Sequence, residues 1–336
     1  MKRIVLLATL FVAVLPSVVS AKRPNVVILL IDDLGYTDLG CYGSEFYRTP
    51  RIDALAGESF RFTDFYSANP VCSPTRAALM TGKSPQRVGI TQWIAPGTGV
   101  ILPHEEETIG EAFADAGYAT GYIGKWHLGE AAEYRPDRQG FAWTKCVSGG
   151  GAPPTYFYPY KEQRGGRTKA KDVPDLEDGK EGDYLTDKLT DYALEFIGDN
   201  RDRPFFFCFG HYAVHTPIQA PEPLVKLNQK RRAEKYGESQ TPVIPEGTLG
   251  SSRGRQDNPT YSAMMDNLDV NVGRVVDRLT ELGLRENTII VFTSDNGGLS
   301  TLRKKRVGPT SVLPLRAGKG WTYEGGIRIP TFGNIG

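Results

Sequence analysis

The sequence predicts an α/β fold, in which helices flank a mostly parallel central sheet on both faces. Three continuous apolar runs, each ending in polar residues, are typical of strands buried on both faces of such a sheet. Amphipathic segments with helical spacing lie between these runs. Strands that alternate with helices favour parallel pairing, and ligands in such folds bind at the carboxyl edge of the sheet.

The elements follow from the position of the apolar residues along the chain. The predicted strands are residues 25–31, 204–209 and 287–293. The predicted helices are residues 49–58, 108–116, 187–197 and 261–282. Two polar stretches, 149–183 and 229–259, have no periodicity and are expected to be long loops that leave the sheet and carry substrate contacts.

Composition and charge exclude some classes of protein. Among 336 residues, 40% are hydrophobic and 24% are charged, which is an ordinary globular balance. Lys and Arg number 40 and Asp and Glu 39, a net charge of +1 that argues against nucleic acid as the main partner.

The first 21 residues have the pattern of a secretory signal peptide: a basic start, an apolar run and small residues before Lys22. An uncleaved anchor is the alternative, but Pro16 breaks the run and spanning a bilayer needs about 20 apolar residues. We therefore expect residues 1–21 to be removed. The remaining chain is expected to be a secreted or periplasmic protein with no stable membrane span, and to form a single α/β domain over residues 22–336.

The chain has four cysteines, Cys41, Cys72, Cys146 and Cys208. In an oxidising compartment an even number permits two disulfides, and the sequence leaves this open. The spacing does not indicate a disulfide scaffold, and the absence of a CxxC pair argues against a structural zinc site.

Oxygen-donor side chains follow two of the predicted strands. Asp32 and Asp33 end the first strand, and Asp295 and Asn296 follow the last one. If these strands are neighbours, the four side chains converge on one cation, and oxygen-only ligation suits Ca²⁺ or Mg²⁺ rather than zinc. A helix cap or turn is the alternative for Asp32-Asp33 alone, but the second pair favours a metal.

A loop bracketed by prolines contains Cys72, and Arg76 follows four residues later at the start of an apolar helix. A helix N-terminus beside a guanidinium is suited to holding an anion. Taken alone, the loop is explained at least as well by a small buried cysteine beside a surface arginine.

Six segments together resemble the sulfatase family, in the order that the family has them and over residues 25–330. The Cys72-Ser-Pro-Thr-Arg76 segment, followed by Leu-Met-Thr-Gly, resembles the first sulfatase signature. Residues 117–127, which end in Gly-Lys125-Trp-His127, resemble the second. The other matching segments are Asp32-Asp33, His215-Thr-Pro, Ser-Asp295-Asn296-Gly and Gly-Lys319-Gly-Trp-Thr-Tyr-Glu-Gly-Gly.

This resemblance implies an alkaline-phosphatase-like fold and hydrolysis of sulfate esters. It implies that a formylglycine-generating enzyme oxidises Cys72 to formylglycine, whose hydrate attacks sulfur and later expels sulfate. It also implies one Ca²⁺. The expected ligands of that ion are Asp32, Asp33, Cys72 in its modified form, Asp295 and Asn296.

The resemblance also assigns the remaining catalytic residues. Arg76 would hold the formylglycine hydrate, His127 would take the proton from its second hydroxyl, and Lys125 would contact both sulfate and hydrate. His215 and Lys319 would bind sulfate and help to protonate the leaving oxygen, a role for which the ordinary pKa of histidine is suited.

Two further polar residues near these motifs have less specific contexts. Ser148 is a weaker candidate for a sulfate contact, and His211 is not assigned a role. The motifs are most similar to the arylsulfatase A and N-acetylgalactosamine-6-sulfatase branch, but they contact the sulfate and not the group that carries it. Because the protein is expected to be exported, sulfated polysaccharides are the favoured substrates, and aryl sulfates are the second choice. A phosphate or phosphonate ester hydrolase of the same superfamily, and an inactive remnant that binds sulfated glycans, are the alternatives.

The end of the sequence departs from the family pattern. In sulfatases the Arg-Ile-Pro segment leads into a further central strand and then a smaller C-terminal domain. Both are expected to be absent from residues 329–336, where the sequence reads as truncated. On this interpretation Lys319 is the least well fixed of the catalytic residues.

Overall fold

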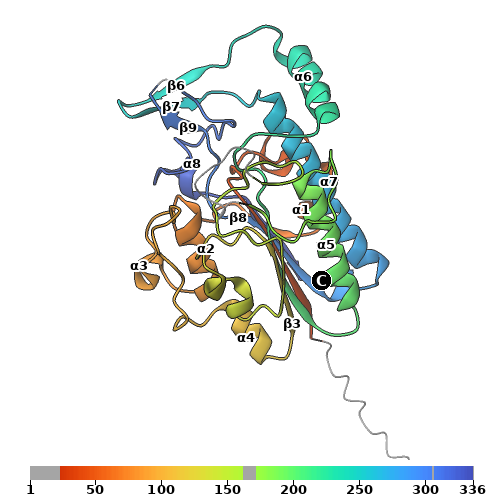
Figure 1. Ribbon diagram of the computed structural model, residues 1–336. Coiled ribbons are helices and arrows are strands. Elements are labelled where there is room, and N and C mark those ends of the chain that lie inside the picture. The colour runs from red at the N-terminus through yellow and green to blue at the C-terminus, as the bar shows by residue number, and fades with distance from the viewer. Residues whose placement is uncertain (1–22, 162–171, 305, 336) are drawn as a thin grey trace, which may run out of the picture.

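The computed structural model describes residues 23–161, 172–304 and 306–335, and its main feature is a seven-stranded sheet between two layers of helices (Figure 1). The predicted signal peptide, residues 1–21, lies outside the described residues. Among the residues described, no helix is both long and apolar enough to cross a membrane. The α/β class predicted from the sequence is confirmed.

The central sheet has the strand order β2-β10-β8-β1-β5-β3-β4. Strands β8, β1, β5, β3 and β4 are parallel, whereas β10 is antiparallel to both of its neighbours. The strands are β1 (Asn25–Ile31), β2 (Phe60–Phe62), β3 (Ala119–Gly124), β4 (Trp143–Lys145), β5 (Phe205–Gly210), β8 (Thr288–Ser294) and β10 (Thr331–Ile335).

Period-two alternation along the buried strands divides the core into two halves. In β5, Phe205, Phe207 and Phe209 pack into one apolar cluster, and Phe206 and Cys208 pack into the other. Strand β1 divides in the same way, so both faces of the central strands are apolar. This is why the sequence shows continuous apolar runs at these strands.

Each face of the sheet is covered by its own helices (Figure 1). Helices α1, α5 and α7 bury apolar residues in the larger cluster, and α2, α3 and α4 cover the other face. Helix α6 packs on α7, and α8 is a single turn near the end of the chain. The helices are α1 (Pro50–Gly57), α2 (Cys72–Thr81), α3 (Pro85–Val88), α4 (Ile109–Asp115), α5 (Leu185–Asp199), α6 (Glu222–Tyr236), α7 (Pro259–Glu281) and α8 (Glu324–Ile327).

The expectation of a structureless loop over residues 229–259 is wrong. Helix α6 extends into it as far as Tyr236, and a hairpin of β6 (Val243–Glu246) and β7 (Gly250–Arg253) follows. With β9 (Thr301–Arg303) this hairpin forms a small antiparallel sheet. The sequence signal fails because α6 has no apolar stripe: within it only Asn228 is buried.

The end of the described chain also differs from expectation, because Thr331–Ile335 does form a central strand. Strand β10 lies between β8 and β2 and pairs with both. Phe332 is buried and stacks on Phe292 of β8, with ring centroids 4.7 Å apart. The prediction that this strand is missing was therefore wrong.

Candidate active site

Four neighbouring parallel strands end at one edge of the sheet, and each delivers candidate residues there. In the pairing of β1 with β8, Ile31 lies opposite Ser294, so Asp32 and Asp295 follow side by side. Strand β5 leads to His215, and β3 leads to Lys125 and His127. Cys72 is the first residue of α2, and Lys319 comes from the loop before α8. The fold thus brings residues from six segments to one edge.

Three side-chain oxygens at this edge are buried without a hydrogen-bond partner among the described residues: Asp32 Oδ1, Asp33 Oδ2 and Asn296 Oδ1. The amide of Asn296 is oriented by its own Nδ2, which donates to Asp33 Oδ1 at 2.8 Å. Buried oxygens are costly unless paired, and three oxygens of this kind suit a hard divalent cation. Three of the predicted ligands therefore offer oxygens that fit Ca²⁺ chemically, whereas both oxygens of Asp295 already accept hydrogen bonds, from Arg76 Nε and from the Asp33 N–H.

Three cations balance the three carboxylates of this acidic centre. Lys125 Nζ lies 2.6 Å from Asp32 Oδ2, and Lys319 Nζ lies 2.6 Å from Asp33 Oδ1. Arg76 Nε donates to Asp295 Oδ2 at 2.8 Å. Each lysine occupies one oxygen of its carboxylate, and the second oxygen is one of those without a partner.

These partners set the pKa of each carboxyl group. Burial raises the pKa of Asp32 well above its usual range, although Lys125 opposes this. Burial acts in the same direction on Asp33, but Lys319 and then His215 outweigh it and hold its pKa below the usual range. Asp33 is therefore the ionised anchor of the centre.

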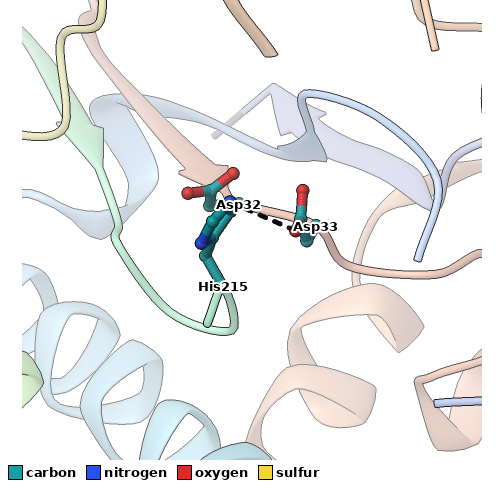
Figure 2. Close-up of side chains that lie close together, drawn as sticks. All are labelled: Asp32, Asp33 and His215. Carbon is teal, nitrogen blue, oxygen red and sulfur yellow. Dashed lines mark ion pairs between the residues drawn. The ribbon is translucent and has the colours of Figure 1, made fainter. Parts of the chain in front are cut away.

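His215 adds a nitrogen to this acidic centre (Figure 2). Its Nδ1 lies 2.8 Å from the Thr216 carbonyl oxygen, which requires a proton on Nδ1 and leaves Nε2 as an acceptor. Nε2 lies 3.6 Å from Asp33 Oδ2, and the ligating atoms of Asp32, Asp33 and His215 lie within 4.8 Å of one another. Burial, helped by Lys319, lowers the pKa of His215 to about 3, so the ring is neutral at neutral pH.

Cys72 and His127 form a second buried pair beside the acidic centre. The sulfur of Cys72 lies 3.2 Å from Nδ1 of His127, and Nε2 lies 2.9 Å from the Ile94 carbonyl oxygen. The carbonyl fixes the proton on Nε2, so Nδ1 is an acceptor directed at position 72. Burial, with Lys125, lowers the pKa of His127 to about 3. His127 is thus a neutral proton acceptor.

Gly151 holds the ring of His127 in this position. A Cβ built on Gly151 would lie 2.4 Å from His127 Cε1, closer than real contacts allow. We predict that Gly151→Ala displaces the ring and lowers turnover about a hundredfold, because small misplacements in an active site cost rate on this scale. The matched control is Gly57→Ala, where a Cβ meets nothing within 4 Å; equal turnover in the two variants would contradict the prediction.

A pocket of about 1030 Å³ opens over these groups, and Cys72, His127, His215 and Lys319 line it. Arg76 and Lys125 are buried and do not line it. Arg76 Nη1 donates to the Lys125 carbonyl oxygen at 2.6 Å, and its Nη2 has no partner among the described residues.

Lys319 is firmly held, contrary to expectation. Besides the ion pair with Asp33, its backbone N–H donates to the Gly298 carbonyl oxygen at 2.9 Å, and the next N–H donates to Pro70. The glycines of its motif permit this packing: a Cβ on Gly326 would lie 1.8 Å from the Trp321 carbonyl oxygen. The loop is fixed by contacts within the described chain.

Ser148, the weaker candidate, and His211, which was assigned no role, lie away from the pocket lining. Ser148 is buried, and its hydroxyl receives a hydrogen bond from Tyr212 at 3.0 Å, so the structure does not support a sulfate contact there. His211 is buried and stacks on Phe209, with centroids 3.7 Å apart. The structure shows all four cysteines as free thiols.

Part of the pocket wall was missed by the sequence analysis. Trp93 and Arg303 line it but belong to no motif and to neither of the two polar stretches. The stretches expected to be loops do contribute, through Gly151 and Thr248. The only sequence signal for these wall residues is the polarity of the two stretches. Pocket walls are assembled from distant segments by tertiary packing, so no local motif marks them.

The fold and this site define an α/β protein with a cation-competent acidic centre, a cysteine and an anion-competent pocket at one sheet edge. The sulfatase family model matches residues 24–333. Arylsulfatase A from Homo sapiens is 34% identical over 96% of this chain and 61% of its own length. N-acetylgalactosamine-6-sulfatase from Canis lupus familiaris is 32% identical over 97% of this chain and 59% of its own.

Solved structures agree with these relatives. Ps i-CgsB, crystallised in complex with k-i-k-neocarrahexaose, superposes with a TM-score of 0.73 at 33% identity, over 93% of this chain and 66% of that one. The chain therefore belongs to the sulfatase family. It spans about three-fifths of the length of the curated relatives it matches.

Proposed function

We propose that this chain hydrolyses sulfate esters at the pocket that contains Cys72. The observation that carries the proposal is the 3.2 Å approach of Cys72 Sγ to the acceptor nitrogen of His127, in one pocket with His215 and Lys319. Family membership adds the reaction class. The chemistry proposed for position 72 is oxidation by a formylglycine-generating enzyme, after which the hydrated aldehyde supplies the nucleophilic hydroxyl.

The proposed metal is one Ca²⁺ bound by Asp32, Asp33, Asp295, Asn296 and modified residue 72. A bound cation there would offset the repulsion between an anionic nucleophile and the sulfate oxygens. The three unpartnered oxygens support this assignment. His215 Nε2, at 3.6 Å from Asp33 Oδ2, faces the same centre.

The side chains of this chain have separate tasks in the proposal. His127 accepts the proton of a hydroxyl at position 72 through Nδ1, because Nε2–H is held by the Ile94 carbonyl. Lys319, at the pocket surface, binds the sulfate group and protonates the leaving oxygen. His215 lines the same pocket, and its unprotonated Nε2 faces the acidic centre. Arg76, whose Nη2 has no partner among the described residues, lies buried behind the pocket lining and orients residue 72.

Turnover of 4-nitrophenyl sulfate by purified chain, with 4-nitrophenyl phosphate as control, tests this function. We expect hydrolysis of the sulfate, with the phosphate ester at least about tenfold slower, because the described residues form one cluster competent to hold a metal, rather than the two-metal site of many phosphatases. Faster hydrolysis of the phosphate would favour the rival hydrolase. Binding without hydrolysis of either ester would favour a non-catalytic remnant.

We infer that the natural substrate is a sulfated carbohydrate, since an exported enzyme meets such polymers outside the cell. The export itself rests on the predicted signal peptide, residues 1–21. The crystal structure of Ps i-CgsB in complex with k-i-k-neocarrahexaose supports the proposal of a carbohydrate substrate. Aryl sulfates remain the second choice of substrate.

A further inference from the structure

The pocket has a basic wall that the catalytic groups do not use. Arg303, at the end of β9, and Lys304, directly after it, line the pocket beside the turn between β6 and β7. We call Arg303 and Lys304 the β9 cation pair. Lys319, in the same pocket, is neutralised by Asp33 at 2.6 Å. Neither member of the β9 cation pair forms an ion pair with a residue that the structure describes.

The small sheet holds the β9 cation pair in place. Arg303 pairs with Gly250 of β7, and the hydroxyl of Ser251 donates to the Lys304 carbonyl oxygen at 2.9 Å. A bridge between Thr301 and Val307 closes the turn on its other side. Both side chains are exposed, so their charge is available to a ligand while their backbone is fixed.

An aromatic rim completes the pocket. Trp93 is 52% exposed and lines it together with Trp321. Two hydrogen bonds fix the backbone of Ile94, which follows Trp93 in the chain. The Ile94 N–H donates to Ser73 Oγ at 3.0 Å, and the Ile94 carbonyl oxygen accepts from His127. Exposed, positioned indole faces are suited to stacking against ligand rings.

The size of the pocket exceeds what a sulfate group requires. At about 1030 Å³ it is at the upper end of the range for small-ligand pockets, with space for more than one sugar ring. A monosulfated aryl ester would leave the cationic wall without a partner.

We propose that the β9 cation pair binds a second anionic group, sulfate or carboxylate, of an oligosaccharide whose reacting sulfate lies at Cys72. The inference rests on the proposed function and specifies its substrate class as a polyanionic saccharide. The reacting group is held by Lys319, and the second group lies against Arg303 and Lys304. The β9 cation pair thus selects the substrate and takes no part in the chemistry.

Binding measured by calorimetry in the Cys72→Ala background tests this, because no turnover then intervenes. The probes are a carrageenan hexasaccharide, whose only anions are sulfates, a monosulfated chondroitin hexasaccharide, whose other anions are carboxylates, and galactose 6-sulfate. We expect Arg303→Ala/Lys304→Ala to weaken binding of at least one hexasaccharide about tenfold at low salt, the scale of two exposed ion pairs. Galactose 6-sulfate should bind unchanged.

Salt and a matched control sharpen the result. High salt should remove most of the difference between the parent and the double variant, since exposed charges are screened. Lys226→Ala/Lys230→Ala removes the same charge from α6, outside the pocket, and should leave every affinity unchanged. The hexasaccharide that loses affinity identifies the second anion as sulfate or carboxylate.

The outcomes separate this inference from the proposed function. Equal affinities in the parent and the double variant for both hexasaccharides, or an equal loss for galactose 6-sulfate, would overturn the subsite. Absence of 4-nitrophenyl sulfate turnover in the unmutated chain would instead overturn the proposed function. A selective loss of hexasaccharide binding would still support the subsite in that case.

Discussion

Cys72→Ala is expected to abolish sulfate-ester turnover while leaving the fold intact. Removal of a nucleophile costs roughly ten-thousandfold or more in rate. The side chain is small and buried at the first residue of α2, so its truncation should cost only about 1 kcal/mol of stability. The measurement is 4-nitrophenyl sulfate hydrolysis beside a thermal melt, with mass analysis of the peptide that contains residue 72.

Cys208→Ala is the matched control. Cys208 is also a buried thiol, but it lies within β5 in the core, so its loss should reduce stability and leave turnover near that of the parent. Cys72→Ser should be inactive unless the host has a converting enzyme that accepts serine. Parent-like turnover in Cys72→Ala would refute the proposed chemistry, and an unmodified thiol in an active preparation would refute the conversion to formylglycine.

The site residues that the sequence could predict are those that directly follow the central strands. Strands β1 and β8 are continuous apolar runs, and the residues directly after them must reach the carboxyl edge of a parallel sheet. Asp33 and Asn296 could therefore be expected to meet, although they lie 263 positions apart along the chain. The reason is geometric: strand direction and register fix where the next residue lies.

The residues that were not predicted depend on packing between distant segments. Helix α6 has no continuous apolar stripe, and β10 is recognised only when Phe332 stacks on Phe292. Gly151 and His127 show the same limit, because a missing Cβ matters only when the ring of a distant residue fills the space. No local sequence pattern reveals that contacts of this kind matter for function.

Added Ca²⁺ is expected to raise the melting temperature and chelation to lower sulfate-ester turnover. An ion that binds only the folded chain stabilises it by about 2.7 kcal/mol at a hundred times its dissociation constant. For a chain of this size that corresponds to a shift of roughly 5 °C. The stabilisation comes from ligation of three buried oxygens that have no hydrogen-bond partner among the described residues, namely Asp32 Oδ1, Asp33 Oδ2 and Asn296 Oδ1. A bound cation offsets the cost of burying them without a partner.

Asn296→Ala isolates the oxygen ligand without changing the charge of the centre. It removes Oδ1, and with it the hydrogen bond from Nδ2 to Asp33, so the Ca²⁺ concentration for half the melting shift should rise at least about tenfold. Asn228→Ala, a buried asparagine between α6 and α7, should lose stability but keep the Ca²⁺ response of the parent. The melting readout does not require turnover, so it tests the metal separately from the chemistry. Equal Ca²⁺ responses in both variants, or stoichiometric zinc without calcium in the purified protein, would contradict the assignment, because a donor set made mostly of carboxylate and amide oxygens favours calcium over zinc.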